Sequence, residues 1–189
     1  MTPFIVLTSR VVPLVADDVD TDQIIPAQLV NSVGQAALAR ALFARLRERD
    51  PPFVLDRPGM PGRSIMLVGS NFGCGSSREA AVWALAAWGV RAIVGRSFNA
   101  TFHANCLQNG VLPVAAPPEH HARLVAAVER DRDLEITIDL PADRVCAGAI
   151  EIACGIEPFA RSLLVSGKDE LQYLLDRADA ITEHEGRNP

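Results

Sequence analysis

The sequence predicts an α/β protein with a mixed parallel and antiparallel sheet, on two observations. Apolar runs alternate with helical patterns through the middle of the chain, in the order 64–68, 76–89, 90–95, 97–110 and 111–114. Strands that alternate with helices indicate parallel pairing through crossover connections. Residues 134–140, LEITIDL, instead alternate strictly between apolar and polar side chains. That pattern indicates a strand with one buried and one solvent-exposed face, which is typical of an antiparallel sheet.

The N-terminal third contributes a further strand and a helix. Residues 4–15 alternate loosely and are predicted as a strand, and residues 17–26, DDVDTDQIIP, follow as an acidic turn. Leucines recur at four-residue spacing over 33–48 as far as Asp50-Pro51-Pro52, which predicts one helix ended by the prolines. Prolines and glycines over 58–62 then indicate a surface loop.

Both central helices are bounded by recognisable end signals. Ser76 and Glu79 have the spacing of a capping box, and Gly89 follows the last apolar residue as a C-terminal stop. The second helical pattern begins at a serine in the same way and ends at Asn109-Gly110.

The C-terminal third is predicted to hold a hairpin and a last helix. Residues 145–153 return through Gly148 as the hairpin partner of 134–140. Asp169 opens a helix with one apolar stripe, made of Leu171, Leu174, Leu175, Ala178 and Ile181.

Length and composition indicate one domain over residues 1–189 of a globular protein. The hydrophobic fraction is 49% and the mean hydropathy is +0.15, which excludes broad disorder. No apolar run approaches the ~20 residues of a membrane span, and the N-terminus lacks a signal-peptide pattern, so a cytoplasmic location is expected. The net charge is −5 with no basic block, which argues against nucleic-acid binding.

The metal-ligating residues do not form a site in the sequence. No CxxC pair occurs among the cysteines, and no HxxxH or HExxH pattern occurs among the histidines. These residues are Cys74, Cys106, Cys146 and Cys154, and His103, His120, His121 and His184. We therefore expect this chain to hold neither a zinc ion nor an iron–sulfur cluster.

Residues 69–79, GSNFGCGSSRE, lie between a predicted strand and a predicted helix and have three interpretations. Glycines and serines at such a point often serve turn geometry and capping alone. Phosphate binding fits poorly, because the stretch lacks both the third glycine of a dinucleotide fingerprint and the Gly-Lys-Ser/Thr ending of a P-loop.

The third interpretation is an anion site with chemistry. The amide groups of a helix N-terminus and the Arg78 guanidinium attract a carboxylate, and one of the two serines remains to face a substrate. A serine alkoxide stabilised there is a general base. No histidine lies within the motif, which disfavours a stand-alone serine hydrolase.

A second cluster of charged residues lies within 17–26, at Asp17, Asp18, Asp20 and Asp22. A solvated acidic turn is the ordinary meaning of such a run. Calcium is disfavoured, because the twelve-residue loop with its glycine and terminal glutamate is absent.

The two clusters together resemble a known family. DDVDTDQIIP, NFGCGSSRE, VRAIVGRSF and NGVLPV, in this order, with a weaker match at IEPFARSLLVSGKDELQYLL, resemble the small subunits of 3-isopropylmalate dehydratases. These are detached swivelling domains of the aconitase superfamily, and the similarity covers nearly the whole chain. The resemblance implies a swivelling β/β/α fold with a mixed sheet, and a partner large subunit that carries a [4Fe-4S] cluster.

The resemblance also implies roles for five residues. Ser76 is the expected base that removes a proton from the substrate carbon, and Ser77 and Arg78 hold a substrate carboxylate. Thr21 and Asp22 match the active-site Thr-Asp pair of the family, with Asp22 orienting the arginine or the serine. The implied reaction is elimination and re-addition of water, which converts the dicarboxylate 2-isopropylmalate to 3-isopropylmalate in leucine biosynthesis.

Two departures from the family pattern concern the substrate. Ala80 and Val82 stand where the family commonly has histidine and proline, and residues 27–43, AQLVNSVGQAALARALF, lack its usual glycine- and aromatic-rich sequence. We expect the loop over 27–35 to sense the side group of the substrate and to be flexible without the partner. A related hydro-lyase for a dimethylmalate or citramalate, and a non-catalytic binding paralogue, remain the alternatives.

Overall fold

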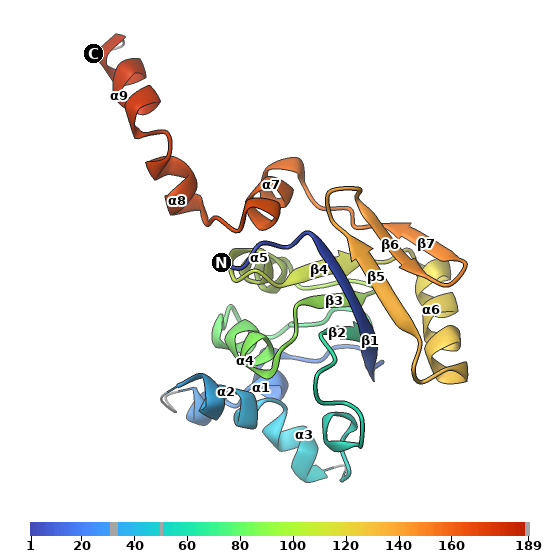
Figure 1. The fold of residues 1–189 in the computed structure, drawn as a ribbon. Helices are drawn as coiled ribbons and strands as arrows, with labels where there is room; N and C mark the ends of the chain where they lie inside the picture. The colour runs from blue at the N-terminus through green and yellow to red at the C-terminus, as the bar shows by residue number, and fades with distance from the viewer. Residues whose placement is uncertain (31–33, 50, 188–189) are drawn as a thin grey trace.

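A computed structural model describes residues 1–30, 34–49 and 51–187, and its centre is one seven-stranded sheet (Figure 1). The strand order is β4-β3-β2-β1-β5-β6-β7, with bounds β1 Val6–Leu14, β2 Ile65–Val68, β3 Ala92–Gly95, β4 Leu112–Ala115, β5 Glu135–Asp139, β6 Arg144–Ala147 and β7 Ile150–Ala153. Strands β1 to β4 are parallel, and β1, β5, β6 and β7 are antiparallel. The predicted mixed α/β sheet is confirmed.

Strand β1 joins the two kinds of pairing. Its first half, Val6 to Arg10, pairs antiparallel with β5, and its second half, Val11 to Leu14, pairs parallel with β2. The carboxyl end of β1 therefore lies beside the carboxyl ends of β2 and β3.

Both faces of the parallel strands are covered. Met66 and Val68 of β2 lie in a core with α1 (Thr21–Ile24), α2 (Gln35–Ala41), α4 (Ala80–Trp88) and α5 (Ala100–Gln108). Ile65 and Leu67, at the alternate positions of β2, lie in a second core on the other face of the sheet. This core includes α6 (Pro118–Arg130), α7 (Pro158–Ser166) and β5 to β7. Because both faces are buried, these strands are continuous apolar runs.

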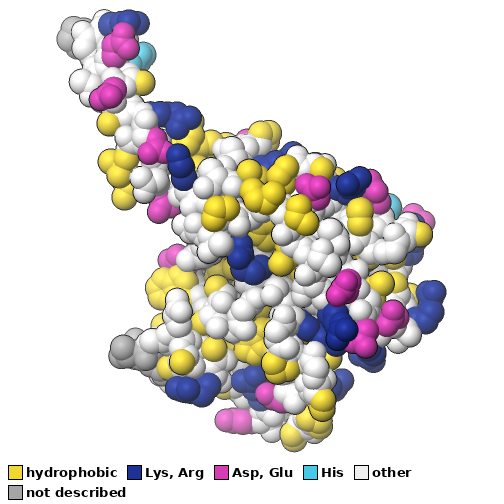
Figure 2. Space-filling view, viewed as in Figure 1, with side chains coloured by type: hydrophobic (Ala, Val, Ile, Leu, Met, Phe, Trp, Pro, Cys, Tyr) yellow, Lys and Arg dark blue, Asp and Glu magenta, His cyan; other side chains and the backbone are white. Residues whose placement is uncertain are grey.

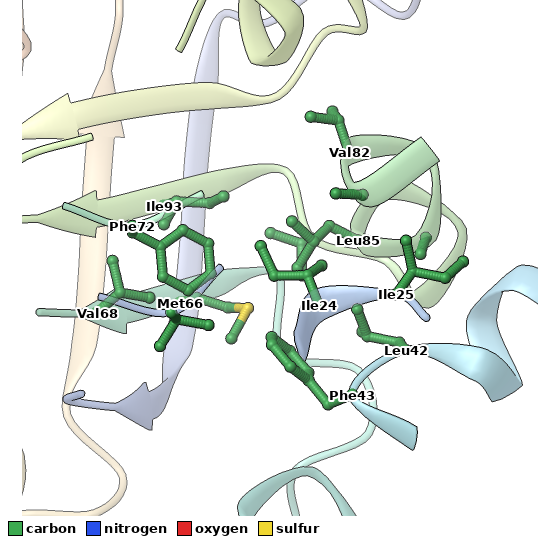
Figure 3. Close-up of a cluster of buried hydrophobic side chains, with 14 of the residues drawn as sticks. Ile24, Ile25, Leu42, Phe43, Met66, Val68, Phe72, Val82, Leu85 and Ile93 are labelled. Atoms are coloured by element: carbon green, nitrogen blue, oxygen red, sulfur yellow. The ribbon is translucent and has the colours of Figure 1, made fainter. Parts of the chain in front are cut away.

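The predicted helix over 33–48 is two helices, α2 and α3 (Ala44–Arg49), and the prediction of one helix is wrong. Phe43 has a φ of 54°, which a helix does not allow, and its amide donates to the carbonyl oxygen of Ile24 at 2.7 Å. Leu42 and Phe43 are both fully buried against α1 (Figure 3). Burial of two adjacent large side chains on one side is possible because the helix breaks there. Residues 31–33, within the loop expected to be flexible, lie outside the described residues; Ala27–Leu29 before them form the 3₁₀ turn η1.

The predicted helix starts at serines are also wrong. Helix α4 begins after Glu79, whose side chain makes no cap bond. The cap of α5 is Asn99, whose side chain accepts from the amides of Thr101 and Phe102. The expected stop at Gly89 is confirmed, with a φ of 112°. Helix α6 was not predicted, although Pro118 at its start and buried Leu124 and Val128 along it are helix signals.

Residues 17–26 are not a simple turn, because they contain α1. The surface loop at 58–62 follows a second 3₁₀ turn, η2 (Val54–Asp56), and carries the buried Met60. The prediction that 145–153 is the hairpin partner of 134–140 is confirmed only in its first half, because the chain turns at Gly148, with a φ of 57°, into a separate hairpin of β6 with β7. Strand β6 is the one that pairs with β5.

The C-terminal helix pattern is also interrupted, into α8 (Glu170–Leu175) and α9 (Ala178–Arg187). Asp169 caps α8, as predicted, by accepting from the amide of Gln172 at 2.7 Å. This arm extends away from the sheet (Figure 1), and hydrophobic side chains lie open along it (Figure 2). Exposed among them are Leu171, Leu174, Leu175 and Ile181. None of the helices over 1–30, 34–49 and 51–187 is long and apolar enough to cross a membrane.

Candidate active site

The candidate site lies at the edge of the sheet where the parallel strands end. Residues 15–20 follow β1, residues 69–79 follow β2 and residues 96–99 follow β3, and open α/β sheets commonly bind ligands outside these ends. Two isolated parallel bridges, Asp20 with Cys74 and Phe72 with Phe98, extend the pairing beyond the strands. Both sequence clusters are thus fixed side by side.

Helix α1 is held in place against the glycine-rich loop. Asp20 and Gln23 form a capping box, in which the Gln23 amide donates to Asp20 Oδ1 at 2.7 Å and the Asp20 amide donates to Gln23 Oε1 at 3.1 Å. The amide of Thr21 then donates to the carbonyl oxygen of Cys74 at 2.9 Å. This orients the Thr21 side chain toward the loop.

Two of the three glycines of the loop, Gly73 and Gly75, are required by space and by backbone conformation. Gly73 has a φ of 77°, and a Cβ atom there would lie 2.1 Å from the Phe102 ring. Gly75 has a φ of 91°, and its Cβ would meet that of Asp20 at 3.1 Å. Because Gly73 and Gly75 have no side chain, the loop can pass close to both α1 and α5.

Ser76 and Thr21 form the first pair at the site. Their hydroxyl oxygens are 2.6 Å apart, with Ser76 exposed and Thr21 only 2% exposed. The backbone amide of Arg78 also donates to Ser76 Oγ, at 3.3 Å. Two hydrogen-bond donors can therefore converge on this oxygen and stabilise negative charge there.

Arg78 and Asp22 form the second pair. Nη1 of Arg78 donates to Asp22 Oδ1 at 3.0 Å and to the carbonyl oxygen of Ile25 at 3.0 Å. Asp22 Oδ1 also accepts from the amide of Ala27 at 3.2 Å, and Asp22 Oδ2 pairs with Arg45 of α3. Desolvation raises the pKa of Asp22, but the Ala27 amide and the two arginines outweigh it, so the pKa lies below its usual value of 3.8. Asp22 thus contacts the arginine rather than Ser76.

Ser77 is exposed and does not cap the following helix. Its carbonyl oxygen accepts a bond from Asn105 Nδ2 at 3.4 Å.

The remaining aspartates of the acidic cluster fix the loops. Asp17 Oδ1 accepts from the amide of Ser70 at 2.6 Å, and Asp18 Oδ1 accepts from Asn71 Nδ2 at 2.8 Å. With Asp20 used as a helix cap, these three carboxylates hold the loops of the site together.

The cysteines do not fit an iron–sulfur cluster. Within the described ranges, no three side chains of His, Cys, Asp or Glu gather as a metal site. Cys106 is buried in α5, and burial raises its pKa well above the usual value. Burial also raises the pKa of Cys154, to about 11, and that of Cys74, where Asp20 and Asp18 contribute.

Comparison with known proteins identifies the family. Residues 1–119 match the Aconitase C-terminal domain family. The chain belongs to this family.

Curated relatives of this aconitase C-terminal domain cover the whole chain. It is 41% identical over 190 residues to a 3-isopropylmalate dehydratase small subunit of Solibacter usitatus, covering 100% of the chain and 96% of the relative. A protein of the same name from Roseiflexus castenholzii is 40% identical over 195 residues, with the same coverage.

A crystal structure of 3-isopropylmalate dehydratase from Methanocaldococcus jannaschii is also similar to this aconitase C-terminal domain. Its TM-score is 0.67 at 26% identity, and the match covers 95% of this chain and 99% of that one. The resemblance inferred from the motifs is therefore confirmed at the level of the family and of the fold.

Two functional features of this aconitase domain were missed by sequence reasoning. The Asp20-x-x-Gln23 spacing is a capping-box signal and could have been found. Arg45 gave no signal, because one arginine in an arginine-rich chain has no visible partner until the fold brings Asp22 to it.

Proposed function

We propose that this chain is the small subunit of a hydro-lyase that converts 2-isopropylmalate to 3-isopropylmalate by dehydration and rehydration. The observation that supports it most is the pairing of Ser76 with Thr21 and of Arg78 with Asp22 at one edge of the sheet. These are the residues to which the family resemblance assigns the chemistry.

Ser76 is the proposed base. In its alkoxide form, Oγ takes a proton from the substrate carbon, the C–H electron pair forms a C=C bond, and the hydroxyl on the neighbouring carbon leaves as hydroxide with its bonding electrons. In rehydration, the hydroxyl adds to the carbon that lost the proton, and the proton adds to the carbon that lost the hydroxyl. Thr21 and the Arg78 amide stabilise the alkoxide before and after the transfer.

Arg78, Asp22 and Ser77 bind and orient the substrate. A guanidinium binds a carboxylate through parallel hydrogen bonds, and Asp22 fixes its direction. Ser77, exposed beside Arg78 in the same loop, adds a hydroxyl donor to that carboxylate.

The proposed enzyme needs a large subunit. Ser76 and Ser77 are exposed to solvent in this chain, whereas elimination chemistry requires a site closed from water. The family resemblance places the [4Fe-4S] cluster on that subunit, and among the described residues of this chain no group of metal-ligating side chains offers a second site.

Anaerobic reconstitution tests this proposal. The chain is mixed with the cluster-bearing subunit of its own organism, and absorbance of the unsaturated intermediate is followed with 2-isopropylmalate and then with dimethylmalate and citramalate. Ser76→Ala is expected to abolish turnover, and Ser162→Ala, at an exposed serine of α7, is the matched control and is expected to retain it.

Other outcomes lead to other conclusions. Turnover of a smaller malate alone would keep the reaction class and replace the substrate, as the changes at Ala80 and Val82 allow. A complex that forms and turns over none of the three would favour a binding paralogue.

A further inference from the structure

Arg45 lies next to the proposed carboxylate-binding pair, although no sequence motif includes it. Its Nη1 contacts Oδ2 of Asp22, and its Nη2 donates to Gln28 Oε1 at 3.2 Å. The side chain is 43% exposed. Exposed ion pairs contribute little to stability, so stability alone gives no reason for this contact.

Asp22 divides its two oxygens between two arginines. Oδ1 accepts from Arg78 and from the amide of Ala27, whereas Oδ2 is taken by Arg45. Both oxygens are therefore occupied, each by a different guanidinium group.

Arg78 is consequently held through a single nitrogen. Nη1 makes both of its contacts, to Asp22 and to the carbonyl oxygen of Ile25. Among the residues that the structure describes, no hydrogen bond or ion pair involves Nη2 or Nε of Arg78. These are the nitrogen atoms that remain for a substrate carboxylate.

An arginine beside one carboxylate prefers a bidentate arrangement with two parallel bonds. Arg78 does not adopt it here: Arg45 contacts the second oxygen, and repulsion between like charges disfavours a second guanidinium group there. Without Arg45, the Arg78 guanidinium would be free to turn and close on both oxygens of Asp22. It would then have fewer N–H groups to offer to substrate.

We propose that Arg45 is a positioning residue that occupies Asp22 Oδ2 and so keeps Arg78 open for the substrate carboxylate. This inference rests on the proposed function, in which Arg78 binds that carboxylate. Arg45 itself touches no substrate: it acts through Asp22.

Kinetics of the reconstituted complex give the first test. Arg45→Met keeps the length of the side chain without its donors, and it is expected to raise KM about tenfold with kcat within about twofold, because the lost binding is shared by ground and transition states. Arg45→Lys restores a donor to Oδ2 and is expected to stay within about threefold of the wild-type KM. Arg49→Met removes the same charge from the exposed far end of α3 and is expected to change neither constant.

A double variant tests whether Arg45 acts through Asp22. In an Asp22→Asn background Arg78 has no carboxylate to close on, so adding Arg45→Met is expected to leave KM unchanged. An equal rise in KM for Arg49→Met would reduce the effect to bulk charge. A fall in kcat alone, or no recovery in Arg45→Lys, would likewise overturn the proposal.

NMR of the isolated chain tests the same inference without activity. With ¹⁵N-labelled arginine, the Nη signals of Arg78, assigned by their loss in Arg78→Lys, are expected to change from averaged to separate resonances in Arg45→Met, because a bidentate pair hinders rotation of the guanidinium group. Unchanged signals would contradict the proposal. If the wild-type complex turns over no malate, the proposed function fails while this measurement still decides the role of Arg45.

Discussion

The hydroxyl oxygens of Thr21 and Ser76 lie 2.6 Å apart, although 55 residues separate them in the chain. The contact exists because β1 and β2 are parallel neighbours, and their following loops are joined by the Asp20–Cys74 bridge. Each hydroxyl depends on the other for its direction.

Removing the Thr21 hydroxyl is expected to slow the reaction. Thr21→Val keeps the shape of this buried side chain and deletes the hydroxyl that can donate to a Ser76 alkoxide, so kcat of the reconstituted enzyme is expected to fall about 10- to 100-fold, the value of one hydrogen bond to a charged group. Thr21→Ser keeps the hydroxyl and is expected to stay within about threefold of wild type. Equal kcat values for the valine and serine variants would remove Thr21 from the mechanism.

Gly73→Ala is expected to destabilise the whole fold. The new Cβ would have to lie 2.1 Å from the Phe102 ring at a φ of 77°, so overpacking and backbone strain act together and the free energy of unfolding falls by about 3–4 kcal/mol.

Gly148→Ala is the matched control for that change. It meets no neighbouring atom at a φ of 57°, so it is expected to cost only about 1 kcal/mol. Urea unfolding of the two variants measures the difference, and similar losses would contradict the crowding at Gly73.

The hydrogen bond from the Ala27 amide, together with the two arginines, holds Asp22 as an anion and predicts an acid-dependent loss of stability. Its pKa in the folded chain is below the usual value of 3.8, so its contribution is present above that pH and is lost as the pH falls through the folded pKa. The wild-type chain is therefore expected to lose more stability than Asp22→Asn between pH 5 and the acid limit of the fold.

Thermal unfolding of both chains over this range measures that difference. The pKa of Asp17 is lowered too, chiefly by its bond from the Ser70 amide, but Asp17 is present in both chains and its effect cancels. Parallel stability curves for the two chains would show that Asp22 is not stabilised as an anion.

Cys74 is expected to be dispensable for the chemistry, although it stands in the centre of the motif. Burial and the nearby Asp20 and Asp18 raise the pKa of its thiol, and its contact with Thr21 runs through the carbonyl oxygen. Cys74→Ala is therefore expected to keep kcat within about threefold, because the backbone contact remains. A loss as large as that of Ser76→Ala would assign the thiol a role in the reaction.

The strands were predictable because burial on one or both faces leaves a pattern in the sequence. The apolar run at Ile65–Val68 and the alternation at Glu135–Asp139 each correspond to one strand. Helix ends were less predictable. Ser76 has the sequence spacing of a cap, but its hydroxyl contacts Thr21 of a distant segment instead.

The break between α2 and α3 had no local signal at all. Leucine spacing continues through it, and only the burial of Phe43 against α1, with its amide bonded to Ile24, explains the turn. Long-range packing overrides a helical pattern when it buries two large side chains together.

The sequence by itself indicated the fold class through its patterns, and the family and the five proposed site residues through the resemblance of its motifs, because these features lie within short segments. The tertiary structure decided which of those residues meet: Thr21 with Ser76, Asp22 with Arg78, and Arg45 as a neighbour that no motif contained. The physical reason is that a motif specifies residue types in one segment. A hydrogen bond between two loops depends instead on the register of the strands that carry them.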